Sequence, residues 1–283
     1  MPDSSPPLEI DYLIIGHVAR DEAGDNARLG GTAAYAGVTA RALGRNVGLV
    51  TSSGPGLDLQ PLSDLELADL PSLRPTTFEN RYEQNGRQQR LHALASPLGL
   101  KDVPAAWRTS PLIHLAPIAG EVDRSLVHAF PQAFLGVTAQ GWLRQWDDAG
   151  QVSASSWTAI KDVLPSASAV VVSLEDLGSE WAAARAMAEQ CRLLVVTDGA
   201  HGAMIFQRNE MRHVPAPVTQ ELDSTGAGDI FAAAFFINLA QTGDVWEAAG
   251  FATRLASASI TVSGVSSINS LVAVHVAERQ VVE

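Results

Sequence analysis

The sequence contains very little cysteine, few basic residues and no long apolar run. Cys191 is the only cysteine among 283 residues, so no intrachain disulfide can form, and a reducing cytoplasm is the expected location. Lys and Arg number 19 against 31 Asp and Glu, which gives a formal net charge of −12. We therefore expect neither nucleic acid nor an anionic membrane as a partner, because both bind basic surfaces. No stretch approaches the ~20 apolar residues that a transmembrane helix needs.

Several well-known motifs are also missing. The sequence has no Gly-x-x-x-x-Gly-Lys-[Ser/Thr] P-loop and no complete Gly-x-Gly-x-x-Gly dinucleotide fingerprint. The seven histidines are not spaced as zinc ligands, and no nucleophile elbow occurs. These absences argue against P-loop NTPases, zinc enzymes and α/β-hydrolases. Nucleotide binding stays open, because backbone N–H groups and a metal ion can hold phosphates without basic side chains.

Short apolar runs alternate with helical patterns along most of the chain. The predicted strands are Tyr12–Ile15, Val47–Thr51, Leu112–Leu115, Phe134–Thr138, Ala169–Ser173 and Leu193–Thr197, with a hairpin formed by Ala203–Phe206 and Glu210–Val214. The predicted helices are Thr32–Leu43, Val122–Phe130, Ser179–Gln190 and two that close the chain, Ala227–Ala240 and Val245–Ser259. This alternation predicts an α/β fold, with a doubly wound, mostly parallel central sheet covered by helices on both faces.

Residues 8–283 are expected to form a single domain after a flexible leader at residues 1–7. Within it, residues 76–95 contain two polar and aromatic runs that flank Asn85-Gly86, a strong hairpin signal. Strands of this polarity cannot lie in the centre of the sheet. They predict either a small β lid over a binding site or an exposed excursion without function.

The segment Leu222–Asp229, followed by an apolar helix, is the most informative part of the sequence. Two glycines and an alanine separate Asp223 from Asp229. Unpaired N–H groups and the macrodipole at a helix N-terminus favour an anion there. A carboxylate beside that anion could accept a proton from an attacking hydroxyl. An Asp-rich loop with an ordinary helix cap is the alternative.

Three further groups of residues follow predicted strands. Asp21 precedes the Gly30-Gly31 turn, where glycines allow the backbone to approach a ligand closely. Glu175 and Asp176 could hold Mg²⁺ or merely cap a helix. The loop at 197–202 could surround phosphates. Because open α/β sheets bind ligands at the carboxyl ends of their strands, these weak signals support one another.

At this point the chain resembles the ribokinase-like (PfkB) carbohydrate kinase family. The resemblance rests on the Gly30-Gly31 turn, the Thr197-x-Gly199-x-x-Gly202 loop and above all residues 223–229, which match an Asp-Thr-x-Gly-Ala-Gly-Asp signature except for Ser224. It implies a kinase that uses ATP and Mg²⁺ to phosphorylate a hydroxyl of a small sugar, polyol or nucleoside, as a monomer or a homodimer.

The resemblance also implies roles for particular residues. Asp229 would be the catalytic base, with the backbone of Gly226, Ala227 and Gly228 as the anion hole. The substrate would contact Asp21, Gly30, Gly31, Asn80, Gln140 and Arg144. The nucleotide would contact Thr197, Gly199, Gly202, Thr225 and Ala256, within reach of the segment 256–265. The metal would lie near Glu175 and Asp176, and a monovalent cation near Asp223 is left open.

Two departures from the family pattern bear on this assignment. The usual Asn-x-x-Glu motif appears as Ser173 and Asp176, so the acid at its last position is retained and the amide at its first position is lost. A sugar-contacting Asn after the glycine turn appears as Tyr35, which argues against ribose. The segment 140–144, which also follows a predicted strand, looks like a subgroup feature that could add substrate contacts, and an inositol-like polyol is the expected acceptor. A non-catalytic sugar- or nucleotide-binding regulator and a nicotinamide-dependent oxidoreductase are the rival interpretations. The intact Gly226–Asp229 motif argues against the former, and the incomplete glycine fingerprint argues against the latter.

Overall fold

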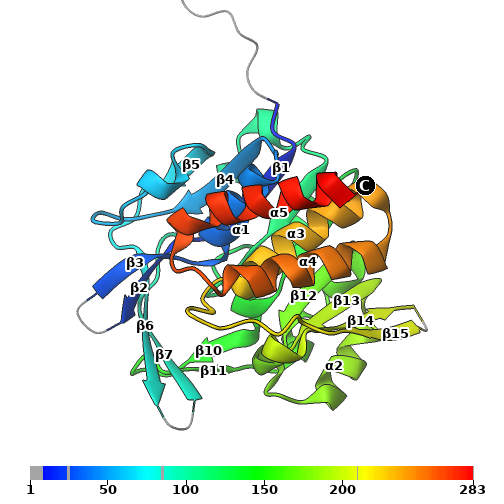
Figure 1. Ribbon diagram of the computed structural model, residues 1–283. Coiled ribbons are helices and arrows are strands. Elements are labelled where there is room, and N and C mark those ends of the chain that lie inside the picture. Colours follow the sequence, from blue (N-terminus) through cyan, green and yellow to red (C-terminus); the bar gives the residue numbers. More distant parts are fainter. Residues whose placement is uncertain (1–8, 24–25, 84–85, 209, 283) are drawn as a thin grey trace, which may run out of the picture.

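The computed structural model describes residues 9–23, 26–83, 86–208 and 210–282, so the predicted leader at residues 1–7 lies outside the described residues. Within these ranges a nine-stranded sheet runs through the molecule in the order β15-β14-β13-β12-β9-β8-β1-β4-β5 (Figure 1). Its strands are β1 (Tyr12–Ile15), β4 (Val47–Ser52), β5 (Glu66–Leu70), β8 (Leu112–Leu115), β9 (Phe134–Thr138), β12 (Ala169–Ser173), β13 (Leu193–Thr197), β14 (Ala203–Gln207) and β15 (Glu210–Val214). From β5 to β13 all neighbours are parallel, while β14 and β15 are antiparallel additions.

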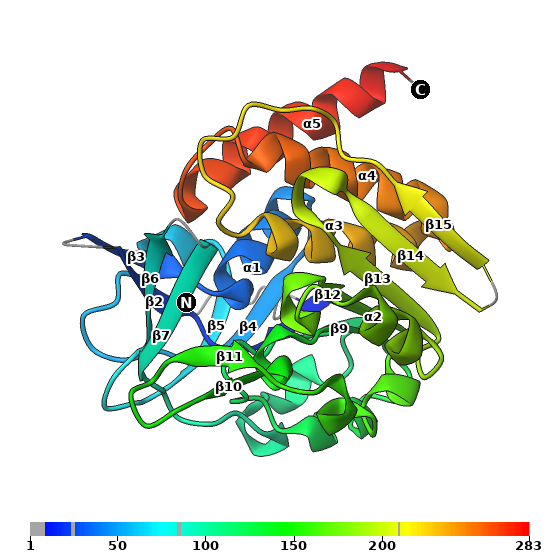
Figure 2. The same cartoon turned by 90° about the horizontal axis from the view of Figure 1, so that it is seen from below.

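Helices cover both faces of this sheet, as the sequence predicts (Figures 1 and 2). One face carries α1 (Thr32–Ala42), α3 (Ala227–Thr242), α4 (Val245–Ser259) and α5 (Ile268–Val282), whose apolar side chains share a core with alternate strand residues. The opposite face carries α2 (Trp181–Ala188) and several 3₁₀ helices over a second core. Across the described residues, no helix has the length and apolar character needed to cross a bilayer.

Short 3₁₀ helices replace regular α-helix in many of the connections. Their bounds are Gln60–Leu62, Leu100–Asp102, Ala105–Trp107, Arg124–His128, Gln140–Leu143, Trp157–Ile160, Leu164–Ser166, Glu175–Leu177, Gly199–His201 and Val265–Ser267. The helix predicted over Val122–Phe130 is therefore wrong: only the 3₁₀ helix Arg124–His128 forms there. The backbone on both sides of Val122 is bonded to Leu98 and Asp123 is extended, so helical turns begin only at Arg124.

The predicted lid hairpin belongs to a separate four-stranded sheet, for which we keep the name lid. This sheet has the order β3-β2-β6-β7, with β2 (Ala19–Ala23), β3 (Asn26–Gly30), β6 (Thr76–Glu83) and β7 (Gly86–Ala93). Asp21, expected in a loop, lies on β2. A further hairpin, β10 (Arg144–Trp146) and β11 (Val152–Ala154), lies beside β7, where the Leu91 amide donates to the Gly150 carbonyl at 2.8 Å (Figure 2).

The buried carboxylate of Glu121 holds together the loops from which the lid departs. It accepts hydrogen bonds from the backbone amides of His17, Ile118 and Ala119 at 2.7–3.0 Å. His17 in turn contacts the Thr76 hydroxyl at 2.7 Å, at the point where β6 leaves the main body. One side chain therefore satisfies three amides that would otherwise be buried without partners.

Glu121→Gln is expected to lower the free energy of unfolding by about 2 kcal/mol, because one oxygen that faces backbone N–H groups becomes an NH₂ donor. Urea denaturation would measure this difference. Asp123→Asn is the matched control, since its exposed side chain caps a 3₁₀ helix through the Ser125 amide alone and should cost less than about 1 kcal/mol. Equal stability of the Glu121→Gln protein and the control would contradict the account of this loop.

Candidate active site

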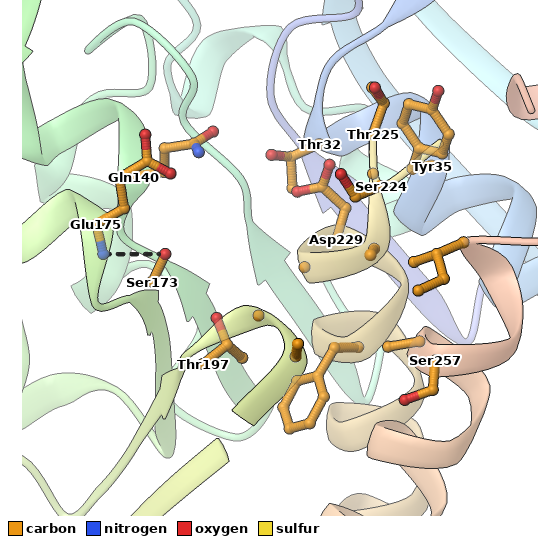
Figure 3. Close-up of a pocket in the computed structure, with 18 of the residues that line it drawn as sticks. Thr32, Tyr35, Gln140, Ser173, Glu175, Thr197, Ser224, Thr225, Asp229 and Ser257 are labelled. Atoms are coloured by element: carbon orange, nitrogen blue, oxygen red, sulfur yellow. Dashed lines mark hydrogen bonds between the residues drawn. The ribbon is translucent and has the colours of Figure 1, made fainter. Parts of the chain in front are cut away.

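A cavity of about 620 Å³ opens where the carboxyl ends of the parallel strands meet the lid and the N-terminus of α3 (Figure 3). Ser173 and Thr197, the last residues of β12 and β13, lie on its wall, as does Gln140, which follows β9. The position agrees with the rule that open α/β sheets bind ligands at the carboxyl ends of their strands. Residues predicted separately from three strand ends and one helix start therefore share one cavity.

Gly226 shapes the start of α3. It has φ of 81°, a left-handed conformation that favours glycine, and its Cα lies against the ring of Tyr35. A Cβ at this position would lie 2.4 Å from two ring atoms of Tyr35. The backbone conformation and this contact both require glycine, so the motif is fixed by the fold as well as by any ligand.

One backbone amide of the predicted anion hole is already hydrogen-bonded within the protein. Ala227 donates its N–H to the Ser224 carbonyl at 3.2 Å, and the Ile230 N–H closes the first helical turn on the Gly226 carbonyl at 2.9 Å. The first N–H groups of a helix have no intrahelical partner. Because α3 begins at Ala227, the amides of Gly228 and Asp229 have no partner inside the helix, and both residues line the cavity.

Gly228 has a different reason to be glycine. Its φ lies outside the left-handed range, and an added Cβ would meet no atom within 4 Å. The residue lines the cavity, so the space beside it is space that a ligand can enter. The fold therefore does not require glycine here, and the missing side chain leaves room for a ligand to approach the backbone closely.

Gly228→Ala is expected to raise the free energy of unfolding by about 0.5–1 kcal/mol, as Gly-to-Ala changes in helices do, yet to weaken binding of a polyphosphate ligand at least tenfold. Denaturation and calorimetric titration with Mg²⁺–ADP would measure the two effects. Gly250→Ala, at a helical position of α4 whose nearest neighbour is the flexible end of Arg254, serves as a control that should leave binding unchanged. Loss of stability without loss of binding would refute the assignment of Gly228.

Asp229 lies in the first turn of α3, half-buried, with its carboxylate beside Thr32 (Figure 3). Desolvation raises its pKa from 3.8 to about 6; the Thr32 hydroxyl and the charge of Arg144 oppose the shift, while Asp21 and Asp176 add to it. A carboxylate with this pKa is mostly ionised at pH 7 and is a stronger base than an ordinary aspartate. It is therefore equipped to accept a proton from a hydroxyl held in the cavity.

On the lid side, Asp21, Gly31, Gln140 and Arg144 line the cavity as predicted for the acceptor. Gly30 and Asn80 lie behind this wall. The Asp21 carboxylate rests on Gly30, and Asn80 accepts a hydrogen bond at 2.9 Å from Gln89, which itself faces the cavity. The lining residues on this side that the sequence did not predict include Thr32, Phe78, Gln89 and Ile118. Alternation along the predicted hairpin was a usable signal for Phe78 and Gln89, because it places both side chains on the same face of the hairpin.

Among the described residues that line the cavity, Arg144 alone carries a permanent positive charge. Its side chain is only 12% exposed; one terminal nitrogen lies 3.9 Å from the Asp176 carboxylate and the other 3.5 Å from the Ile118 carbonyl. The guanidinium also lies 5.8 Å from the ring centroid of Phe78 on the lid. Arg144 is thus held in place between the lid and the strand-end carboxylates.

On the opposite side, all five residues predicted for the nucleotide line the cavity: Thr197, Gly199, Gly202, Thr225 and Ala256. Gly202 has a structural role, because its φ is 97° and a Cβ would lie 2.1 Å from the Val214 carbonyl oxygen. The loop after β15 and the end of α4 add mostly apolar or uncharged groups, namely Ala216, Pro217, Val218, Thr219, Thr253, Ser257 and Ile260. This side therefore offers apolar surface rather than positive charge.

Glu175 and Asp176 lie on the cavity wall, in a short 3₁₀ helix after β12. Asp176 accepts the Ser173 amide at 3.3 Å, and the Glu175 amide donates to the Ser173 hydroxyl at 3.2 Å (Figure 3). Within the described part of the chain no cluster of three His, Cys, Asp or Glu could hold a metal ion. The pair suits Mg²⁺ nonetheless, because this ion commonly takes one or two carboxylates and completes its shell with water and phosphate oxygens.

The carboxylate of Asp223 is hydrogen-bonded to three donors within the protein. It accepts hydrogen bonds from Arg28 of β3 at 2.9 Å, from the Ser263 hydroxyl at 2.7 Å and from the Thr225 amide at 3.0 Å. These hydrogen bonds and the charge of Arg28 outweigh desolvation and lower its pKa. Arg28 therefore supplies positive charge at the place where the sequence left a monovalent cation open.

Comparisons with known proteins agree with this architecture. A family model described as pfkB family carbohydrate kinase matches residues 127–271, just over half of the chain. One solved structure with the same fold is a pyrophosphate-dependent kinase in the ribokinase family complexed with a pyrophosphate analogue and myo-inositol; the TM-score is 0.75 at 21% identity, over 89% of this chain and 96% of that chain. Another is a fructokinase double mutant from Vibrio cholerae O395 bound to fructose, ADP and potassium; the TM-score is 0.71 at 18% identity, over 92% of this chain and 96% of that chain. The chain thus has a ribokinase-like fold.

The chain belongs to the pfkB family of carbohydrate kinases. Among curated proteins, a deoxyribokinase from Salmonella typhi is 37% identical over 87 residues, which are 30% of this chain and 28% of that protein. The matches to curated relatives span between 20% and 28% of the length of those relatives. They bear out family membership and leave the acceptor to be argued from the cavity itself.

Proposed function

We propose that this protein transfers the γ-phosphoryl group of ATP to a hydroxyl of a small sugar or polyol. The observation that carries the proposal is the position of Asp229. Its carboxylate, with a raised pKa, opens onto the same cavity as the N-terminal amides of α3, between the lid and the predicted nucleotide side. A hydroxyl held near Asp229 would face a phosphoryl group held at the helix start, which is the arrangement that in-line transfer requires.

The chain's own residues would divide the reaction between them. Asp229 orients the acceptor hydroxyl and takes its proton as the new bond forms. The amides and the dipole of α3 stabilise the phosphoryl oxygens. Glu175 and Asp176 would hold Mg²⁺, which when bound supplies neutralisation of phosphate charge. The lid strands carry Asp21 and Phe78 over the acceptor and exclude water, so that the phosphoryl group goes to the hydroxyl.

ATP is favoured as the donor over pyrophosphate, although three solved structures of the same fold are named as pyrophosphate-dependent kinases. Pyrophosphate has no base to bury, so its affinity would depend on positive charge. On the described cavity wall, Arg144 stands among the carboxylates of Asp21, Glu175, Asp176, Glu221 and Asp229. The apolar surface of Val218, Ala256 and Ile260 instead suits the base and sugar of a nucleotide. The proposal needs no monovalent cation at Asp223, because Arg28 supplies charge there.

An uncharged cyclic polyol such as myo-inositol is the preferred acceptor class. Asp21, Gln89 and Gln140 offer hydrogen-bonding groups to several hydroxyls, while Phe78 and Ile118 offer an apolar face to the ring carbons. A phosphorylated acceptor would meet Asp21 and Asp229 with one arginine to offset them. The neighbour complexed with myo-inositol gives independent support. A reducing cytoplasm and a monomeric or dimeric state remain the expected setting.

The alternative is a non-catalytic regulator that binds sugar or nucleotide on the same fold. A binding protein gains nothing from a half-buried carboxylate that destabilises it, whereas a kinase uses that carboxylate as the base. Phosphorus-31 NMR of the purified protein with Mg²⁺, ATP or pyrophosphate, and a panel of inositols, sugars and nucleosides would test the proposal. A new phosphomonoester signal that needs both ATP and one acceptor would support it. Turnover with pyrophosphate alone would overturn the donor assignment, and nucleotide binding without product across the panel would favour the regulator.

A further inference from the structure

Arg28 of β3 connects the lid to the anion-hole loop. Its guanidinium donates to Asp223 at 2.9 Å and to the Ser263 hydroxyl at 3.0 Å, and Ser263 donates to the same carboxylate oxygen at 2.7 Å. The three groups come from the lid, from the loop before α3 and from the segment that joins α4 to α5. Figures 1 and 2 show β3 next to that last segment.

Asp223 is well placed to control the anion hole. Its other carboxylate oxygen accepts the Thr225 amide at 3.0 Å, one residue before Gly226. The Leu222 and Asp223 amides both donate to the Ile260 carbonyl, at 2.7 and 3.1 Å. The conformation of residues 222–226, and hence the direction of the amides that follow, therefore depends on the contacts of this aspartate.

Arg28 and Asp21 share one face of the lid. They are direct cross-strand partners in the antiparallel β2–β3 pair, and side chains at such positions lie on the same side of the sheet. Asp21 lines the lid side of the cavity, with its carboxylate over Gly30. The lid position that brings Asp21 over an acceptor is thus the same position that brings Arg28 to Asp223.

The contact is stronger than an ordinary surface ion pair. Arg28 is 47% exposed but the Asp223 side chain only 16%, and three donors converge on that carboxylate. Isolated exposed pairs contribute little, whereas networks with a partly buried member contribute more. Other lid arginines differ: Arg20 pairs with Glu22 of its own strand, on the opposite face from Asp21.

We propose that Arg28 is a positioning residue that couples closure of the lid over the acceptor to ordering of the anion hole for the donor. The benefit of this coupling rests on the proposed kinase function: it would prevent transfer of the phosphoryl group to water when no acceptor is bound. Its structural content does not depend on that function. Two parts of the cavity, formed by segments almost 200 residues apart in sequence, are joined by Arg28 and Asp223.

Hydrogen exchange of the ligand-free protein tests the structural content without any substrate. In Arg28→Ala, the amides of Thr225 and Ala227, which are hydrogen-bonded to Asp223 and Ser224, are expected to exchange about tenfold faster than in the unaltered protein, since a coupling of ordinary size has been removed. Arg28→Lys should restore part of the protection, and Arg20→Ala should exchange like the unaltered protein. Unchanged exchange in Arg28→Ala would overturn the inference, even if the kinase function were established.

Kinetics test the coupling itself. With Mg²⁺–ATP and the acceptor identified in the panel, Arg28→Ala should lower kcat about tenfold and raise the ratio of ATP hydrolysis to transfer, and saturating acceptor should no longer tighten Mg²⁺–ADP binding. Arg20→Ala should preserve all three quantities. A variant in which acceptor still tightens ADP binding as before would contradict the proposal. Should the protein turn over no acceptor, the exchange experiment still decides the role of Arg28.

Discussion

Asp229→Asn is expected to lower kcat at least about a hundredfold, the usual contribution of a positioned general base, with little change in Mg²⁺–ADP affinity. Asparagine keeps the shape of the side chain but cannot accept the proton of the attacking hydroxyl. Steady-state kinetics with the identified acceptor and calorimetry with Mg²⁺–ADP would measure the two quantities. Retained turnover in this variant would show that another group is the base.

The same substitution should also stabilise the protein above pH 6. The folded pKa of Asp229, about 6, is raised above its ordinary value of 3.8, so folding favours the protonated form. The stability that this group contributes is fully present below about pH 4 and is lost as pH rises through 6. Because the cavity admits water, we expect a loss of about 2 kcal/mol rather than the full value of the shift.

Urea denaturation at pH 4 and pH 7.5 measures this pH effect. Asp229→Asn should be the more stable protein at pH 7.5 by about 2 kcal/mol and close to the unaltered protein at pH 4. Asp244→Asn is the matched control, since Asp244 is an exposed N-cap of α4 and asparagine caps helices equally well. A pH-independent difference for Asp229→Asn would mean that the carboxylate is not desolvated in the folded protein.

Gly226→Ala is expected to lower the free energy of unfolding by about 3–4 kcal/mol and to abolish measurable turnover. Alanine at a φ of 81° costs about 1–2 kcal/mol, and its Cβ would overlap the Tyr35 ring, which adds a cost typical of overpacking. The displaced backbone would also misdirect the amides of α3. Denaturation and kinetics on the same preparation would measure both effects.

Gly243→Ala separates these two causes. Gly243 follows α3 with φ of 70°, and an added Cβ would meet nothing within 4 Å, so only the backbone cost of about 1 kcal/mol applies. A double-mutant cycle of Gly226→Ala with Tyr35→Ala should then recover part of the difference. Equal costs at the two glycines would show that Tyr35 does not constrain the anion-hole loop.

Local patterns predicted most of the central fold. The buried parallel strands appear in the sequence as short apolar runs, and α4 begins after Asp244 and ends at Ser259 as expected. Sequence reasoning missed the β2–β3 hairpin, β5, β10–β11 and a third closing helix, α5. Most of these edge elements carry polar, half-exposed side chains, and tertiary pairing rather than periodicity decides whether they form.

The candidate site divides in the same way. Residues tied to a glycine-rich loop or a strand end, such as Asp229 and Thr197, could be found from the sequence, because the motif and the carboxyl-end rule point to one place. The register of the lid strands brings Phe78 and Gln89 to the cavity, and Arg28 contacts Asp223 although 195 positions separate them in the sequence. Alternation along the hairpin could have placed Phe78 and Gln89 on one face, but no local pattern encodes the contact of Arg28 with Asp223, which needs the three-dimensional structure.

Transfer of label from γ-³²P-ATP to myo-inositol or another polyol of the panel tests the central claim most directly. The unaltered protein is expected to place the label in an organic phosphomonoester, and Asp229→Asn, which should still bind Mg²⁺–ADP, is expected to leave the label in ATP. Label that appears only as inorganic phosphate, or equal transfer by both proteins, would contradict the account of this cavity as a phosphoryl-transfer site with Asp229 as its base.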